Sequence, residues 1–332
     1  MRRRGPSAGS APAEERVPAD QDDEELPPPA SLTEAQLLHL REHGFLRLDR
    51  VATTAETSHI RGVVEKLFAA RAGYEEGAHF NFAGADDDPA APSFPQIIAP
   101  HNYAASLRRT DYYKRASAIA RQILGPEARF GGDHTLLKPA LNGPVTPWHQ
   151  DEAFRNPNSE YREISIWMPL QPVNEVNGCM QFIPGTHRGP ILPHRSQNND
   201  PRAHALEACE GVDLAAAVSC PLPAGGCTIH TGRTLHAAGP NRSTAPRLAY
   251  VLNFVIPPVP ALSPRSFPWL EEKETARLKR MRVWMRRGGV FVETWRLVKR
   301  TEPRDYGRLL SELMRKASRL RTLCSRRKAA EQ

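Results

Sequence analysis

Residues 227–256 read CTIHTGRTLHAAGPNRSTAPRLAYVLNFVI and contain two apolar runs on either side of a Gly-Pro-Asn turn. The first run covers 227–230 and the second covers 248–256. Further runs of this kind precede them at 136–137, 164–170 and 180–183. Short apolar runs separated by Pro, Gly and Asn are typical of antiparallel strands. The middle of the chain is therefore predicted to form an all-β core, either a sandwich or a barrel.

Helical patterns precede this core. Ser31 and Glu34 form a capping-box pattern, and Gly44 is placed to end the helix that follows. The polar and acidic stretch at 72–104 is predicted to be a loop, of a length that often serves a function. Periodicity also predicts a strand at 45–50 and helices near 54–71 and 111–124.

The two ends of the chain differ from its middle. Residues 1–30 are predicted to be disordered, because they are rich in Pro, Ala and acidic residues and cannot bury enough apolar surface. Residues 31–268 are predicted to form the folded domain, and 269–332 a basic helical extension packed on it. Of the net charge of +8, the region 277–332 contributes 18 Lys or Arg against five Asp or Glu. Solvated arginines on packed helices are the favoured interpretation of this excess, and nucleic-acid binding is the less favoured one.

The sequence favours a cytoplasmic protein. No apolar run reaches the roughly 18 to 20 residues that cross a bilayer, and neither a secretory signal nor a peroxisomal SKL ending is present. The five cysteines include no CxxC pair, which fits reduced thiols, and Cys179 and Cys227 are expected to be buried in strands. Nothing in the sequence indicates an oligomeric state.

Two histidines and one aspartate are the candidate metal ligands. Alternate residues of an extended segment point the same way, so His149 and Asp151 could bind one ion. Alone this triplet is a weak signal, but His236 stands at a strand end before the Gly-Pro-Asn turn, and Arg247 opens the next strand. If that turn closes a hairpin, His236 and Arg247 lie roughly opposite each other and face the same side.

This set of residues indicates a particular chemistry. Two imidazoles and one carboxylate on one face of an octahedral ion form the facial triad of non-haem Fe(II) oxygenases, with three positions left open. A chelating 2-oxo acid and dioxygen can fill those positions. The far carboxylate of 2-oxoglutarate then requires a fixed cation, and the guanidinium of Arg247 matches its charge and planar shape.

The chain resembles the phytanoyl-CoA dioxygenase family, which includes ectoine hydroxylases and bacterial tailoring enzymes. The shared motifs extend over about residues 31–256 and keep the order and spacing of that family, including the eleven-residue step from the distal histidine to the arginine. His230 is a rival ligand, but only His236 has this step to Arg247. The motifs are Lys138-Pro139, Pro147 to Asp151, Trp167 to Leu170, Asn177 to His187, and His236 to Arg247.

The resemblance implies a fold that is mainly β with flanking helices, with a double-stranded β-helix, or jelly roll, as its core. It implies that His149, Asp151 and His236 bind Fe(II) and that Arg247 binds 2-oxoglutarate. Trp167 would lie beside the cosubstrate, although an ordinary core tryptophan is equally compatible with its position. Lys138 is a candidate contact to cosubstrate or substrate, although a surface lysine is the simpler account.

Two positions refine this assignment. Ala238 stands where many relatives carry a hydroxyl residue that helps to bind the cosubstrate carboxylate. Either Arg247 acts with another donor, such as Ser243, or the affinity for the cosubstrate is weaker. Halogenating relatives have a small residue in place of the carboxylate of Asp151, so halogenation is not expected.

The implied activity is that of a dioxygenase that uses Fe(II), 2-oxoglutarate and O2. We expect it to hydroxylate a small organic molecule or natural-product intermediate, with release of succinate and CO2. One alternative is that the same iron chemistry leads to desaturation, cyclisation or epimerisation. Another is a catalytically inactive jelly-roll protein that binds a partner through its basic tail, against which the intact triad and Arg247 argue.

Overall fold

The computed structural model describes residues 31–88, 93–141 and 143–300. The expected disorder of 1–30 and the expected helical pattern beyond residue 300 lie outside the described residues.

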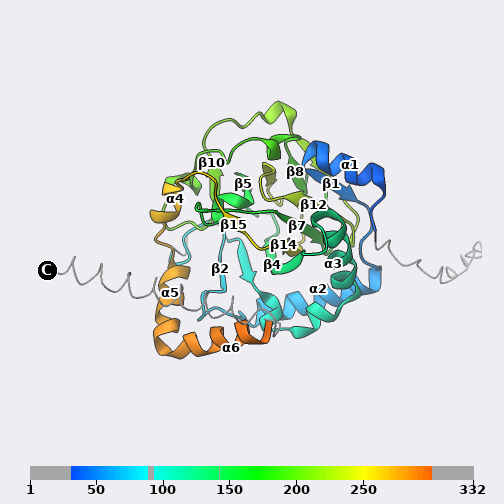
Figure 1. Cartoon of the computed structure of the whole chain (residues 1–332). Coiled ribbons are helices and arrows are strands. Elements are labelled where there is room, and N and C mark those ends of the chain that lie inside the picture. Colours follow the sequence, from blue (N-terminus) through cyan, green and yellow to red (C-terminus); the bar gives the residue numbers. More distant parts are fainter. Residues whose placement is uncertain (1–30, 89–92, 142, 301–332) are drawn as a thin grey trace, which may run out of the picture.

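Two antiparallel sheets form the centre of the molecule (Figure 1). The large sheet has seven strands in the order β1-β12-β7-β14-β4-β3-β2, and the small sheet has four in the order β11-β8-β13-β5. The large sheet consists of β1 (Phe45–Leu48), β2 (His79–Asn81), β3 (Pro95–Ile98), β4 (Arg129–Lys138), β7 (Glu163–Pro169), β12 (Cys227–Thr231) and β14 (Arg247–Val255). The small sheet consists of β5 (Thr146–His149), β8 (Met180–Phe182), β11 (Val218–Cys220) and β13 (His236–Ala238). Two short ladders pair β9 (His194–Ser196) with β10 (Leu206–Ala208), and β6 (Ser159–Glu160) with β15 (Val259–Pro260).

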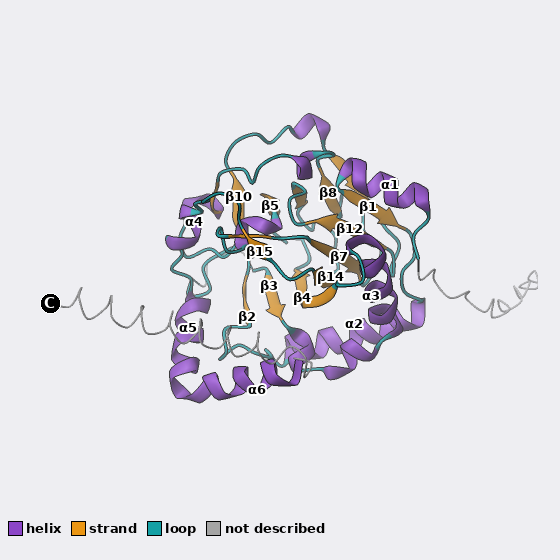
Figure 2. Ribbon diagram, in the orientation of Figure 1, coloured by secondary structure: helices purple, strands orange, loops and turns teal. Residues whose placement is uncertain are grey.

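Helices pack on the outer face of the large sheet (Figure 2). They are α1 (Glu34–His43), α2 (Thr54–Ala69) and α3 (Asp111–Leu124), which precede the core strands. After the core strands come α4 (Pro268–Glu271), which contacts β9, α5 (Ala276–Trp284), which contacts Gly77 before β2, and α6 (Val290–Arg300). Ile60 of α2 and Ile119 of α3 join one apolar core with Ile166 and Tyr250 of the sheet. The expectation of a mainly β core with flanking helices is confirmed.

Strand alternation separates this outer core from the space between the two sheets. In β7, Ile164, Ile166 and Met168 belong to the core under the helices, whereas Trp167 belongs to a second core that includes Phe182 of the small sheet. Because successive side chains of a strand point to opposite faces, Ser165 lies on the same face as Trp167. Polar residues at alternate positions of the large sheet therefore face the small sheet.

The cap of α1 differs from the predicted one. The side chain of Thr33 accepts a hydrogen bond from the backbone of Gln36, and the Gln36 side chain accepts one from the backbone of Thr33. The predicted Ser31–Glu34 pair is wrong, because Leu32 is buried and its backbone hydrogen-bonds the side chain of Gln122 on α3. Gly44 ends the helix as predicted, in the left-handed region with φ of 83°.

The stretch 72–104 is not a continuous loop as predicted. It contains β2 and β3, which extend the large sheet at one edge. Phe80, Phe94 and Ile97 are buried there. The two strands are only three and four residues long, and the Gly, Asp and Pro around them leave no run long enough to indicate a strand.

The hairpin expected between His236 and Arg247 is also absent. β13 belongs to the small sheet and β14 to the large one, so the Gly-Pro-Asn turn crosses between the sheets. Asn241 holds this crossing, because its side-chain nitrogen donates to the carbonyl oxygens of Lys138, Pro139 and Ala245. His236 and Arg247 consequently stand on different sheets.

Gly178, in the turn before β8, has a φ of 83°, and a Cβ there would lie 2.4 Å from the carbonyl oxygen of Gly239. We expect Gly178→Ala to lower the free energy of unfolding by about 2–4 kcal/mol, from the left-handed backbone and the clash. Gly62→Ala in α2 is the control, because no atom would lie within 4 Å of the added Cβ. This variant should raise the free energy of unfolding by about 0.5–1 kcal/mol. Urea-unfolding midpoints measure both, and equal midpoints for the two variants would contradict this packing.

Candidate metal centre

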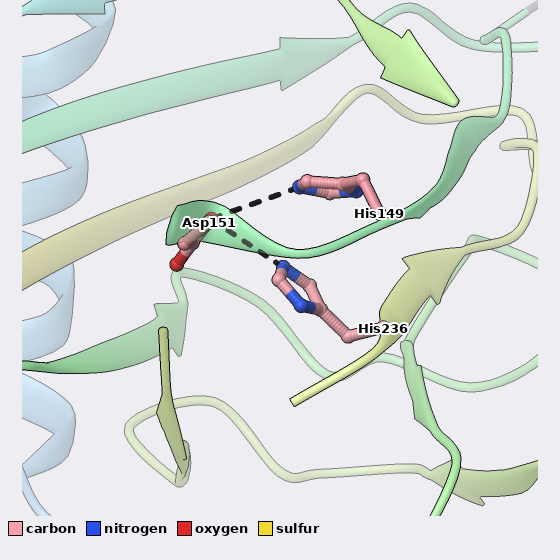
Figure 3. Close-up of side chains that lie close together, drawn as sticks. All are labelled: His149, Asp151 and His236. Atoms are coloured by element: carbon pink, nitrogen blue, oxygen red, sulfur yellow. Dashed lines mark ion pairs between the residues drawn. The ribbon is translucent and has the colours of Figure 1, made fainter. Parts of the chain in front are cut away.

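His149, Asp151 and His236 come together at one end of the small sheet. His149 is the last residue of β5, His236 is the first residue of β13, and the two are register partners. Asp151 opens a short 3-10 helix, Asp151–Phe154, directly after β5. One ligand atom from each residue lies within 4.8 Å of the others, and Figure 3 shows the two rings and the carboxylate turned toward one another.

Backbone carbonyls orient both imidazole rings. Nδ1 of His149 lies 2.7 Å from the carbonyl oxygen of Pro147, and Nδ1 of His236 lies 2.8 Å from that of Thr234. Because a carbonyl can only accept, Nδ1 of each ring carries the proton and donates it. The unprotonated Nε2 atoms then face Oδ1 of Asp151, each at 3.7 Å. Both rings are in the tautomer that binds a metal.

The second oxygen of Asp151 is held by the large sheet. Oδ2 accepts a 2.7 Å hydrogen bond from the hydroxyl of Ser165, and that hydroxyl accepts one of 2.7 Å from Nδ2 of Asn253. Nε2 of His230 lies 3.4 Å from the same Oδ2. The carboxylate is therefore divided, with Oδ1 directed at the candidate ligands and Oδ2 fixed by residues of β7, β12 and β14.

The charges of the site follow from its burial. Burial lowers the pKa of His149 and of His236, which keeps both rings neutral near pH 7. Burial acts to raise the pKa of the Asp151 carboxyl, but His236, His230 and His149 outweigh it and hold this pKa well below its usual range. The centre thus presents one carboxylate and two neutral imidazoles to a divalent cation. This donor set fits non-haem iron.

Two buried cations lie between the same sheets. Lys138 of β4 and Arg247 of β14 are register partners and are 0% and 2% exposed. Nζ of Lys138 donates to the carbonyl oxygens of Ala238, at 3.0 Å, and Gly239. Nε of Arg247 is buried without a hydrogen-bond partner, and its guanidinium lies 5.4 Å from the centroid of the Trp167 ring. No carboxylate of the described residues forms an ion pair with either cation.

The buried charges of Lys138 and Arg247 favour the binding of an anion beside them. Burial lowers the pKa of Arg247 to about 9, and burial together with Arg247 lowers the pKa of Lys138 well below its usual value. An uncompensated charge in a protein interior is costly unless a ligand neutralises it. The space beside Arg247 therefore fits an organic carboxylate such as one end of 2-oxoglutarate.

Thr228 adds a neutral donor that the sequence did not single out. It is 0% exposed, its hydroxyl has no hydrogen-bond partner, and it is the register partner of Trp167. The alternation of β12 could have placed it, since Thr228 stands two residues before His230. Ser243 lies elsewhere, because its hydroxyl donates to Asn241 and Ala245 within the turn.

Gln150, which lies between the candidate ligands His149 and Asp151 in the sequence, is held in place by hydrogen bonds. Its backbone N–H donates to Nε2 of His194 at 3.2 Å, and Nδ1–H of His194 donates to the carbonyl oxygen of Leu192 at 2.7 Å. Its side-chain nitrogen donates to the carbonyl oxygen of Arg233 at 2.8 Å. His194 was not predicted from the sequence, because it belongs to the short strand β9 and reaches Gln150 only through the folded structure.

Comparison with known proteins identifies the family. The family model described as phytanoyl-CoA dioxygenase matches residues 40–249, which include the three candidate ligands and Arg247. The chain belongs to the phytanoyl-CoA dioxygenase family. This confirms the resemblance inferred from the sequence motifs.

Individual relatives and solved structures extend the comparison. EvdO2 of Micromonospora carbonacea var. aurantiaca, solved in complex with 2-oxoglutarate, is 34% identical, with a TM-score of 0.62 over 72% of this chain and 97% of EvdO2. A probable alpha-ketoglutarate-dependent hypophosphite dioxygenase of Stutzerimonas stutzeri is 30% identical over 48% of this chain, and the match spans 56% of that relative. An ectoine dioxygenase of Bordetella parapertussis is 25% identical over 71% of this chain and 81% of its own length. The likeness to EvdO2 confirms the jelly-roll core.

We expect His236→Ala to weaken binding of Fe(II) by more than about a hundredfold, because a ligand is lost. His230→Ala should weaken it by no more than about tenfold, because Nε2 of His230 approaches the outer oxygen Oδ2 of Asp151, at 3.4 Å, and not the ligand atom Oδ1. Anaerobic Fe(II) titration of the purified variants measures both values. Retained binding in His236→Ala together with loss in His230→Ala would show that His230 is the ligand.

Ser165→Ala removes the donor to Oδ2 of Asp151, and we expect Fe(II) to bind about 10- to 100-fold more weakly. The control is Ser117→Ala, whose hydroxyl bonds only the carbonyl oxygen of Tyr113 within α3. That variant should bind Fe(II) as the wild type does. Equal affinities in all three proteins would remove Ser165 from the support of the metal centre.

Proposed function

We propose that this chain is an Fe(II)- and 2-oxoglutarate-dependent dioxygenase that hydroxylates a small organic molecule, such as a natural-product intermediate. The observation that carries the proposal is the combination of a divided carboxylate among imidazoles with a buried, uncompensated pair of cations. Membership of the phytanoyl-CoA dioxygenase family and the 2-oxoglutarate bound by EvdO2 support it.

In this proposal each residue has a distinct task. His149, His236 and Oδ1 of Asp151 would hold Fe(II), and Arg247 with Lys138 would hold a carboxylate of 2-oxoglutarate. When bound, iron and cosubstrate supply the oxidising power, with one atom of O2 entering succinate as CO2 leaves and the other entering the substrate. The chain supplies orientation, through the Nδ1–H donors of both ligand rings and through the hydroxyl of Ser165 on Oδ2.

Aromatic rings keep water from the interior behind the ligands. Phe182 stacks on Phe45 with ring centroids 4.5 Å apart, and it lies 5.3 Å from the ring of His230. Trp167 is 4% exposed and forms the wall beside Arg247. Hydrogen bonds and charges in such a dry space are stronger than at the surface, which favours tight binding of an anionic cosubstrate.

Thr228 would replace the hydroxyl that many relatives carry at the position of Ala238. Its buried, unpartnered hydroxyl and its place beside Trp167 support this assignment. Ser243, the other hydroxyl considered, is held in the turn by Asn241 and Ala245, so we assign no cosubstrate contact to it.

We also propose a cytoplasmic location. The described cysteines are free thiols, as expected in a reducing compartment: Cys179, Cys209, Cys220 and Cys227. Within the described part of the chain, none of the helices has the length and apolar character needed to span a membrane.

We also propose that the chain consists of an oxygenase domain at 31–268 and a helical extension at 269–332. Contacts of α5 support the packing of the extension on the domain, because Nε of Arg277 donates to the carbonyl oxygen of Gly77 and Arg280 pairs with Asp86. The proposed partner is a small-molecule substrate rather than nucleic acid.

Arg247→Lys keeps the charge but loses the planar fork of the guanidinium, so we expect binding of 2-oxoglutarate to weaken by about 1–3 kcal/mol. Arg242→Lys, at an exposed position in the preceding turn, should bind as the wild type does. Dissociation constants measured under argon with Fe(II) present check both variants. An unchanged constant in Arg247→Lys would exclude Arg247 from the cosubstrate pocket.

The activity itself is tested by incubating the protein with candidate substrates and measuring succinate release together with O2 uptake. A product that gains one oxygen atom supports hydroxylation. A product that loses two hydrogens would indicate desaturation or cyclisation instead of hydroxylation. A product with an unchanged formula would indicate epimerisation. Bound iron without turnover of 2-oxoglutarate would instead indicate an inactive binding protein.

A further inference from the structure

A cationic residue from outside the family-matched region packs on an aromatic side chain of the large sheet. Helix α5 follows residues 40–249 and lies beside the β2 edge of the large sheet (Figure 1). Its Arg277 donates from Nε to the carbonyl oxygen of Gly77 at 2.8 Å, and the guanidinium carbon lies 4.9 Å from the centroid of the Phe80 ring. Burial lowers the pKa of Arg277 to about 10.

Arg277 has no acidic partner of its own. The charge of Asp86 acts to raise the pKa of Arg277, but Oδ2 of Asp86 pairs with Arg280 and its Oδ1 accepts from the backbone of Asn81. No ion pair to Arg277 is present among the described residues. The guanidinium of Arg277 is therefore largely withdrawn from water without a neutralising group, which is costly unless a ligand supplies one.

A row of rings connects Arg277 with the metal centre. The ring of His204 lies 4.4 Å from that of Phe80 and 5.8 Å, stacked, from that of Phe154. Phe154 in turn lies 5.9 Å from the candidate ligand His149. At these spacings the rings contact one another and form a continuous aromatic wall. Such a wall suits a flat or apolar organic body lying along it.

Two further groups give this region its polarity. Lys273 donates to the carbonyl oxygens of Ala203, at 2.9 Å, and His204, at 2.7 Å, both neutral acceptors. Burial, and after it the charges of Arg277 and Lys273, lower the pKa of His204 well below its usual value. Gln96, the register partner of Phe80, has a buried amide oxygen without a hydrogen-bond partner. The region is positively charged and contains an unpaired acceptor.

We propose that α5 completes a substrate subsite for an organic anion, with Arg277 binding a carboxylate or phosphate group of the substrate. The rings of Phe80, His204 and Phe154 would hold the organic body between that anion and the metal centre. Lys273 adds positive charge without direct contact, because its donors are already used by carbonyl oxygens and by Ser196. This inference rests on the proposed function and narrows its substrate to acidic molecules.

The first test needs no variant. The full chain is loaded with Fe(II) and saturating 2-oxoglutarate under argon, so that the pocket of Arg247 and Lys138 is filled. Calorimetric titration then compares benzoate and phenyl phosphate with the neutral benzyl alcohol. We expect at least one anion to bind about tenfold or more tightly than the alcohol, as for a charge-assisted contact. Equal binding of the alcohol and both anions overturns the proposal.

Variants then locate the anion. Arg277→Gln should weaken binding of the preferred anion by about tenfold or more. Arg282→Gln removes the same charge from an exposed position of α5 and should leave that binding unchanged. Equal affinities in the wild type and Arg277→Gln, or equal losses in the two variants, would overturn the assignment to Arg277. If Arg277→Gln does not fold, Arg277→Lys replaces it, and unchanged affinity for benzoate in that variant is the contradicting result.

The comparison of benzoate with phenyl phosphate separates the two anion classes. The dissociation constant of 2-oxoglutarate, measured first in the same samples, separates this inference from the proposed function. Absence of measurable 2-oxoglutarate binding to the wild type counts against the proposed function. Normal 2-oxoglutarate binding without preference for an anionic probe counts against the subsite alone.

Discussion

A carboxylate largely withdrawn from water is unfavourable unless both of its oxygens have partners, and at Asp151, whose side chain is 26% exposed, the protein itself satisfies only one of them. Its Oδ2 is bound by the hydroxyl of Ser165 on the large sheet, whereas Oδ1 faces the unprotonated Nε2 atoms of two imidazoles of the small sheet and is left for a cation. The position of the carboxylate therefore depends on the two sheets being packed at a fixed distance. The turn held by Asn241, which carries the chain from β13 to β14, maintains that relation. The metal centre is in this sense a property of the whole jelly roll.

The distribution of satisfied and unsatisfied groups shows where ligands belong. Glu152, 1% exposed, is bound by Arg233 and Arg265 at 2.8 Å each, so its charge is balanced inside the protein. Between the sheets the opposite holds, because Arg247 and Thr228 keep buried polar atoms without partners. A buried polar group that is left open in this way can be completed by a ligand. The same reasoning connects Arg277 at the β2 edge with an anionic substrate, since its neighbour Arg280 is paired and Arg277 is not.

Local signals in the sequence predicted much of the secondary structure, and long-range contacts explain what they missed. The Gly44 helix end, the helices near 54–71 and 111–124 and the five apolar strand runs follow from periodicity and breakers, and the structure confirms them. Thr33 and Gln36 form a capping-box pattern as readily as Ser31 and Glu34 do, and the burial of Leu32 against α3 selects the Thr33 cap. β2 depends on pairing with β3, and β3 on pairing with β4, which the local sequence does not show. In the site, the family motifs indicated His149, Asp151, His236 and Arg247. Ser165, Asn253, Thr228 and His194 were missed, because each contributes through a partner on a distant strand or ladder.

The central claim is that one divalent iron and one 2-oxoglutarate meet between the two sheets. The most direct measurement is an anaerobic titration of the full chain with Fe(II), followed by 2-oxoglutarate, monitored by visible absorption. The account predicts saturation at one Fe(II) per chain and a charge-transfer band that appears only when 2-oxoglutarate is added, because the cosubstrate must chelate the iron through open positions of the facial triad. Absence of stoichiometric iron binding, or iron binding without a band at saturating 2-oxoglutarate, would contradict it.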